Sequence, residues 1–90
     1  MQQIESGTPI NRTTTGTVSL VAGTLLGYYV NNKTAGATLV LRDGGASGTA
    51  ITGTVTPLIG FHCMNTYMPN GCHATIAVQP MDITFFFAAG

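Results

Sequence analysis

The sequence predicts an all-β fold, a single antiparallel β-sandwich of jelly-roll type with about seven short strands. Short runs of β-branched and aromatic residues alternate with turns rich in glycine, proline, asparagine and aspartate, which is typical of all-β domains. No segment of ten or more residues repeats apolar side chains every 3.6 positions without a glycine or proline interruption, so no helix is predicted. Ninety residues indicate one domain rather than two.

Seven runs are predicted as strands: 17–21, 25–31, 38–42, 49–56, 58–64, 72–79 and 82–87. Neighbouring residues of a strand point to opposite faces. Leu39 and Leu41 are therefore expected in the core. By the same alternation, Leu26 and Tyr28 share one face of their strand and Leu25 lies on the other.

The N-terminal segment is predicted to be an extended arm outside the sandwich. Residues 1–16 are polar and rich in threonine, with no alternation of apolar side chains. Pro9 cannot occupy a central strand, because proline lacks the backbone N–H that a strand donates. We place the arm at residues 1–12 and the β-sandwich domain at residues 13–90.

Charged residues are nearly absent. Three basic and three acidic residues make up 7% of the chain, against about one-quarter in an average soluble domain. A net charge of zero offers no electrostatic attraction to nucleic acid or to an anionic membrane, so neither partner is expected. The apolar runs are far shorter than the ~20 residues of a spanning helix. The first six residues do not resemble a secretory signal, so we expect synthesis in the cytoplasm.

A surface with so few charges is typical of a subunit that is covered by neighbouring subunits in an assembly. The last strand supports this interpretation, because Phe85 and Phe86 lie on its opposite faces. An edge strand with aromatic side chains on both faces aggregates unless it is paired or covered. We therefore expect a homo-oligomer. The predicted assembly surface combines arm residues with side chains at the rim of the sandwich: Ile4, Pro9, Ile10, Arg12, Tyr29, Met68 and Phe86.

Four residues are possible zinc ligands: His62, Cys63, Cys72 and His73. If their two strands form a hairpin, Cys63 pairs with Cys72 and His62 with His73. The cysteines then share one face and the histidines the other, which makes two half-sites instead of one tetrahedral site. In that register the cysteines either form a disulfide or pack as free thiols, and both alternatives stay open. No metal or other cofactor is predicted, and a small metal-binding protein is kept as the second alternative function.

Catalytic groups are scarce. The only carboxylates are Glu5 in the arm, Asp43 in a turn and Asp82 at a strand start, so no pair stands at a controlled spacing. A cysteine–histidine dyad would lack an orienting acid nearby in sequence. The glycine-rich stretch 44–48 lacks the lysine of a phosphate-binding loop. We expect no enzymatic activity.

The first alternative function is that of a carbohydrate- or receptor-binding module, and it depends on three tyrosines. Tyr28, Tyr29 and Tyr67 would stack on sugar rings as aromatic platforms do on bases. The competing interpretation is that they pack in the core or in an interface, with the phenol tips reaching water or a partner. The feature that would distinguish such a module from an assembly subunit is a set of coplanar, exposed tyrosines in an otherwise monomeric domain.

Five short motifs follow one another: LGYYVNN at 26–32, TLVLRDG at 38–44, SGTAI at 47–51, PNG at 69–71 and DITF at 82–85. This succession resembles the small β-sandwich virion proteins of tailed bacteriophages, in which GVVVN, TLYDG, SGT-I, NGL and DVTV recur in that order. The resemblance covers residues 17–87. Cys72 stands where those proteins have an apolar residue, and the cysteine pair is not part of their pattern.

The resemblance implies a role in a virion. Members of that group decorate or cement capsids or belong to other virion parts, often as trimers around capsid axes. The expected function is a capsid decoration or cement subunit that stabilises the head by bridging capsid subunits. Its expected partners are itself, as a homotrimer, and the major capsid protein, at the capsid surface. A tail or fibre location belongs to the binding-module alternative.

Overall fold

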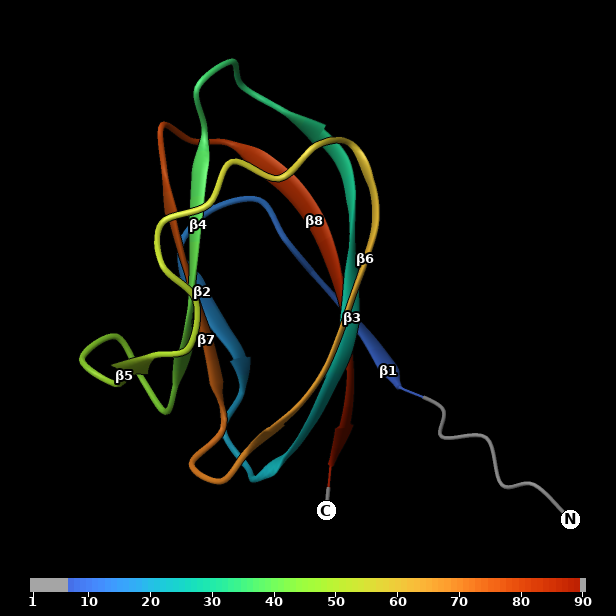
Figure 1. The fold of residues 1–90 in the computed structure, drawn as a ribbon, viewed down its shortest axis with the longest axis vertical. Coiled ribbons are helices and arrows are strands. Elements are labelled where there is room, and N and C mark those ends of the chain that lie inside the picture. The colour runs from blue at the N-terminus through green and yellow to red at the C-terminus, as the bar shows by residue number, and fades with distance from the viewer. Residues whose placement is uncertain (1–6, 90) are drawn as a thin grey trace, which may run out of the picture.

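Two antiparallel four-stranded sheets pack face to face, as the two columns of strands in Figure 1 show. The computed structural model describes residues 7–89. The strands are β1 (Thr8–Arg12), β2 (Gly16–Ser19), β3 (Gly23–Lys33), β4 (Thr38–Asp43), β5 (Thr49–Ala50), β6 (Gly60–Met68), β7 (Cys72–Ala77) and β8 (Met81–Ala89). The predicted all-β sandwich is confirmed, and the described residues contain eight strands instead of about seven.

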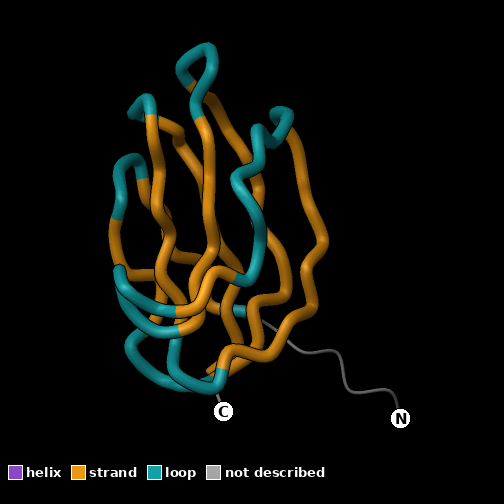
Figure 2. The backbone as a smooth tube through the Cα atoms, turned by 60° about the vertical axis from the view of Figure 1, so that its left-hand side comes forward, coloured by secondary structure: helices purple, strands orange, loops and turns teal. Residues whose placement is uncertain are grey.

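The strand order shows that the first four strands pair with the last four strands in reverse order. One sheet has the order β1-β8-β3-β6 and the other β2-β7-β4-β5. Each strand of the first half pairs with its mirror partner in the second half, from β1 with β8 to β4 with β5. The β3–β8 and β4–β7 pairings complete the two sheets. This is the jelly-roll arrangement, and it places the connecting loops at the two ends of the sandwich (Figure 2).

Alternating apolar side chains from both sheets fill the space between the layers. Leu39 and Leu41 of β4 are fully buried, as predicted, and Phe85 of β8 is the largest fully buried side chain. The strand β8 lies between β1 and β3, so it is not an edge strand. Its pairing on both sides supplies the protection that its two aromatic faces require. No helix within residues 7–89 is long and apolar enough to cross a bilayer.

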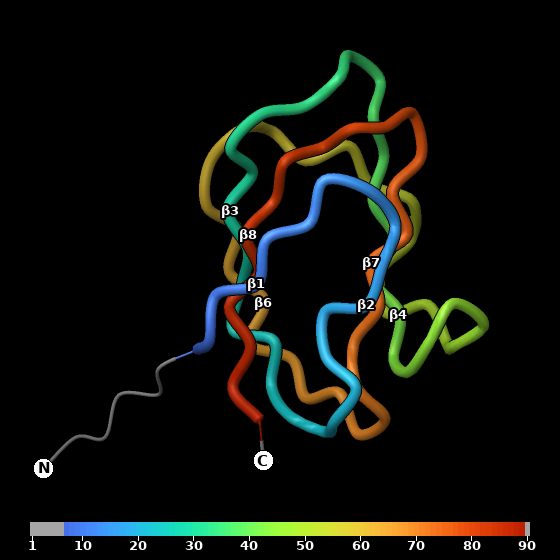
Figure 3. Tube along the Cα trace, turned by 180° about the vertical axis from the view of Figure 1, so that it is seen from behind, coloured from blue at the N-terminus to red at the C-terminus, as the bar shows by residue number. Residues whose placement is uncertain are grey.

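The predicted arm is wrong for residues 8–12, which form β1. This strand pairs with β8 from Thr8↔Phe87 to Arg12↔Ile83, and Figure 3 shows the chain then passing from one layer to β2 in the other. Pro9 is accommodated because β1 lies at the edge of its sheet, where the missing N–H costs no sheet hydrogen bond. The rest of the predicted arm, residues 1–6 with Ile4, lies outside the described residues.

Candidate functional site

The outer face of the β1-β8-β3-β6 sheet divides into two zones along the strands. The polar zone consists of Asn11, Asn31, Asp82 and Thr84. The apolar zone consists of Pro9, Phe61 and Phe86. Tyr29 lies at their border, since it pairs with Thr84 of β8 on one side and with Phe61 of β6 on the other.

Hydrogen bonds across three strands hold the polar zone together. Nδ2 of Asn11, on β1, donates to Oδ1 of Asp82 at 2.7 Å and to Oγ1 of Thr84 at 3.2 Å. It also donates to the carbonyl of Ile83 at 3.1 Å. From the other side, Nδ2 of Asn31, on β3, donates to Oγ1 of Thr84 at 3.1 Å and lies 3.5 Å from Oδ1 of Asp82. Both amides therefore turn their nitrogen toward β8.

A β-bulge positions Asn31. Val30 of β3 pairs with Ile83 of β8, and Asn32 pairs with the adjacent Asp82. Asn31 is therefore an extra residue on β3 that has no partner on β8. Bulges re-aim side chains and are frequent beside functional sites. Here the bulge places Asn31 where its amide reaches both Thr84 and Asp82.

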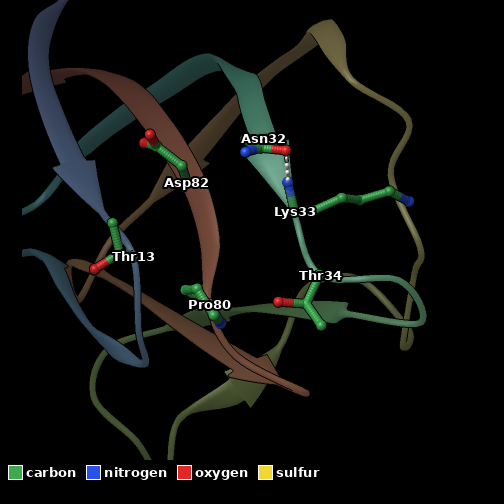
Figure 4. Close-up of a pocket in the computed structure, with 6 residues that line it drawn as sticks. All are labelled: Thr13, Asn32, Lys33, Thr34, Pro80 and Asp82. Carbon is green, nitrogen blue, oxygen red and sulfur yellow. Dashed lines mark hydrogen bonds between the residues drawn. The ribbon is translucent and has the colours of Figure 1, made fainter.

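A pocket of about 310 Å³ adjoins the polar zone at the end of the sandwich, a size at the lower limit of small-molecule sites. Asp82 belongs to both the pocket and the polar zone. The other lining residues are Thr13, Asn32, Lys33, Thr34 and Pro80. In Figure 4 the Lys33 side chain points away from Asp82, so the carboxylate is not covered by that cation.

The apolar zone is built around a glycine. The rings of Phe61 and Phe86 lie with centroids 6.2 Å apart and planes tilted by 53°. Between their strands, a Cβ on Gly27 would meet Phe61 Cζ at 2.7 Å and the carbonyl oxygen of His62 at 2.6 Å. The glycine therefore leaves room for the Phe61 ring over β3. The side chain of Phe61 is 56% exposed and Phe86 is half-buried.

Three of the predicted assembly residues gather on this face, namely Pro9, Tyr29 and Phe86. The prediction is wrong for Met68, which is fully buried because it ends β6 on the core-facing side. Ile10 packs against the core. Arg12 is half-buried with its guanidinium over Gly16.

The predicted pairing of Cys63 with Cys72 is wrong, because their strands do not form a hairpin. The strand β6 pairs with β3 in one sheet, and β7 pairs with β2 and β4 in the other. The connection crosses between sheets at Gly71, whose φ of 97° is left-handed and whose missing Cβ would lie 2.5 Å from the Ser19 carbonyl oxygen. Both thiols are free, with Cys63 exposed and Cys72 buried.

The two histidines are separated as well. His62 stacks on the buried Tyr28, with ring centroids 5.0 Å apart, and its Nε2 donates to the carbonyl of Leu58 at 2.7 Å. His73 lies in the other sheet, between β2 and β4. Within residues 7–89, no three histidine, cysteine or acidic side chains come together as a metal site.

Two buried groups of β7 have shifted proton affinities. Burial, with a further contribution from the Asp43 carboxylate, raises the pKa of Cys72 to about 12. Burial, followed by the positive charges of Arg42 and Arg12, lowers the pKa of His73. No described residue makes a hydrogen bond to either ring nitrogen of His73.

Of the three tyrosines, Tyr28 is buried and cannot meet a ligand, whereas Tyr29 and Tyr67 are 43% and 56% exposed. Further exposed apolar side chains lie at positions that no local sequence pattern marks as functional. These belong to turns and to the β5–β6 connection: Leu20, Val21, Ile51, Leu58, Ile59 and Val78. The predicted strand 17–21 includes Leu20, but β2 ends at Ser19, which leaves Leu20 87% exposed.

Comparisons with known proteins yield no relative. No protein-family model matches the chain, and neither a curated protein nor a solved structure is significantly similar to it.

Proposed function

We propose that this protein is a structural subunit of a virion, a capsid decoration or cement protein that associates as a homotrimer and docks on the major capsid protein. The carrying observation is the apolar zone on the outer face of the β1-β8-β3-β6 sheet. Aromatic side chains exposed side by side mark protein–protein contact sites. They also supply most of the binding energy in such interfaces.

Charge distribution supports burial of this zone. The apolar zone contains no Asp, Glu, Lys, Arg or His side chain, and its cross-strand neighbours on β3 are Gly27 and Tyr29. Interface centres are depleted in charge because desolvating a charge costs free energy. The zone can therefore be covered by a neighbour without burying an unpaired charge.

The strand β6 gives the zone an open edge. It is the last strand of its sheet, so its outward N–H and C=O groups are free to pair with another chain. A bulge at Met64 and Asn65, where Asn65 has a φ of 51°, divides this edge. Contact with a neighbour is therefore proposed at the first half, Gly60 to Cys63, beside the exposed ring of Phe61.

The resemblance to phage virion proteins supplies the kind of assembly. Jelly rolls form viral capsid domains but also lectins and cupins, so the fold alone does not choose among these functions. The five motifs and the nearly uncharged surface favour the virion. Stabilising a head by bridging subunits requires no catalytic residue and no cofactor, and the proposed location is the capsid surface.

Native mass spectrometry and analytical ultracentrifugation test the assembly. The unmodified protein should be a trimer, and Phe61→Asp should dissociate it because the variant places a carboxylate in the apolar zone. Ala77→Asp is the matched control, since Ala77 is exposed on the opposite sheet and should leave the trimer intact. A soluble, monodisperse monomer of the unmodified protein at micromolar concentration would contradict the proposal.

The virion location is tested separately. Antibodies against the purified protein should label the heads of phage particles produced from the genome that encodes this sequence. Labelling of the tail alone would leave a virion role but would overturn the decoration of the capsid. An absence of the protein from purified particles would overturn both.

A further inference from the structure

The polar zone turns unsatisfied acceptor atoms toward solvent. Because the amide nitrogens of Asn11 and Asn31 point at β8, their Oδ1 atoms point away from it. Within residues 7–89, no side-chain or backbone donor contacts these two oxygens or Oδ2 of Asp82. The Thr84 hydroxyl accepts from both amides, so its own hydrogen remains available to donate. The result is three fixed acceptors and one donor on an exposed surface.

An aromatic ring borders this group. Tyr29 pairs directly with Thr84, and cross-strand neighbours have Cβ atoms about 4.5–5.5 Å apart. Asn31 follows two residues along β3 on the same face, roughly 7 Å from Tyr29 by the rise of a strand. A ligand that contacts the acceptors therefore also lies within reach of the exposed Tyr29 side chain.

We propose that the polar zone and Tyr29 form a binding site for a neutral oligosaccharide. A sugar ring has hydroxyl groups that satisfy acceptors and donors at its rim, and an apolar C–H face that packs on an aromatic ring. An apolar surface combined with a few convergent polar groups is the general design of ligand sites. The tyrosine contributes contact area with few rotatable bonds, so little conformational entropy is lost on binding.

The adjoining pocket favours a chain of sugars over a single one. Asp82 belongs to both the pocket and the polar zone, so one ligand can bridge the two. The pocket adds Thr13, Asn32 and Thr34 as further hydroxyl and amide groups (Figure 4). A second sugar unit in the pocket would bind these groups while the first packs on Tyr29.

Charge restricts the class of sugar. The free acceptors of the polar zone are a carboxylate oxygen and two amide oxygens, all carrying negative charge density, and Lys33 in the pocket lining points away from Asp82 (Figure 4). Uronic acids and sulfated sugars are therefore repelled from the polar zone. A calcium ion is a poorer fit, because calcium takes six to eight oxygen ligands and this group offers a single carboxylate. The proposed ligand is therefore neutral and binds without a bridging cation.

This site is independent of the proposed assembly role. The apolar zone and the polar zone lie on different segments of the same sheet, and Tyr29 lies at the border between them. The two roles are therefore separable by substitution: Asn31→Ala should impair sugar binding and preserve the trimer, whereas Phe61→Asp should do the reverse.

The test is a titration of ¹⁵N-labelled protein with maltohexaose, cellohexaose and chitohexaose, and with a heparin-derived hexasaccharide as the acidic comparison. At least one neutral hexasaccharide should shift the side-chain amide signals of Asn11 and Asn31 and the Tyr29 signals, with or without EDTA. Asn31→Ala and Tyr29→Ala should each weaken binding about tenfold or more, the effect of losing one well-placed contact. Tyr67→Ala is the matched control, because Tyr67 is an exposed tyrosine elsewhere on the same face, and it should bind normally.

Several outcomes would overturn the site. These are an absence of shifts with all three neutral sugars at millimolar concentration, shifts centred on Phe61 and Phe86, or binding that EDTA abolishes. Equal or tighter binding of the acidic hexasaccharide would overturn the neutral class. The backbone amide spectrum verifies that each variant is folded. Should Asn31→Ala unfold, Asn11→Ala removes an acceptor on the opposite side of β8 and gives the same test.

Discussion

Phe61 on β6 contacts Phe86 on β8 across the intervening strand β3, with ring centroids 6.2 Å apart. The contact exists because Gly27 stands between them on β3. A Cβ there would lie 2.7 Å from Phe61 Cζ and 2.6 Å from the His62 carbonyl oxygen. The absence of one side chain on the central strand thus creates the aromatic surface assigned to assembly.

Gly27→Ala should therefore destabilise the fold and disturb the apolar zone. The added methyl group displaces the Phe61 ring and presses on the β6 backbone, and overpacking of this kind costs about 1–3 kcal/mol. Urea unfolding measures the loss. Gly53→Ala is the control, since among residues 7–89 only the chain neighbours of Gly53 could lie within 4 Å of a Cβ there. It should change stability by less than about 0.5 kcal/mol. Equal stability of the two variants would contradict the close approach.

The predictable part of this fold is the part that follows from local alternation. Period-two spacing alone predicts that Leu39 and Leu41 lie in the core, and both are fully buried. The same rule was wrong for Leu25, which is fully buried whereas Leu26 is half-buried. A bulge between Leu25 and Gly27 shifts the alternation by one residue, so that side chains before and after it follow different patterns of facing the core. No local sequence pattern marks the position of this bulge.

The β1 strand was missed for a related reason. It contributes only Ile10 to the core boundary. It is held in place by pairing with β8, from Thr8↔Phe87 to Arg12↔Ile83, which is far away in the chain. The error at Cys63 and Cys72 has another origin. The connection between β6 and β7 has three residues, which is compatible with a hairpin and also with a crossover between sheets. Which of the two forms depends on contacts of Gly71 with residues far away in the sequence.

The candidate site was only partly predictable. Tyr29 and Phe86 were identified as surface aromatics from their strands. The polar zone was not, because Asn11 and Asp82 are 71 positions apart and each residue alone is typical of a turn or strand end. Their proximity is a property of the rolled topology, which places β1 beside β8.

The two thiols should react at very different rates. Cys63 is exposed and Cys72 is buried, with the pKa of Cys72 raised to about 12, so almost no Cys72 thiolate exists at neutral pH. A thiol reagent should label one equivalent rapidly and the second only after unfolding. Cys63→Ser should abolish the rapid phase. Two rapid phases, or none, would contradict this arrangement.

The Asp43 carboxylate joins the end of β4 to the β6–β7 connection. Oδ1 accepts from the backbone N–H of Asn70 at 2.9 Å, and Oδ2 accepts from its Nδ2 at 3.2 Å. Asp43→Ala should lower the free energy of unfolding by about 1.5–3 kcal/mol, as expected for hydrogen bonds to a charged group. Asn70→Ala keeps the backbone bond and should cost less. A smaller loss for Asp43→Ala than for Asn70→Ala in urea unfolding would contradict this role.

His73 should make the protein less stable in mild acid. Burial, then the positive charges of Arg42 and Arg12, lowers its pKa below the ordinary value of 6.5. As the pH falls through about 6.5, the unfolded chain therefore binds a proton that the folded protein does not, and the free energy of unfolding decreases until the folded-state pKa is passed. Urea unfolding between about pH 7.5 and pH 5.5 should show this decrease, and His73→Gln should reduce it. NMR titration of the ring in the unmodified protein gives an independent check, because its midpoint should lie below 6.5. A midpoint above that value, or an unchanged pH dependence in His73→Gln, would show that the ring is not held neutral by its surroundings.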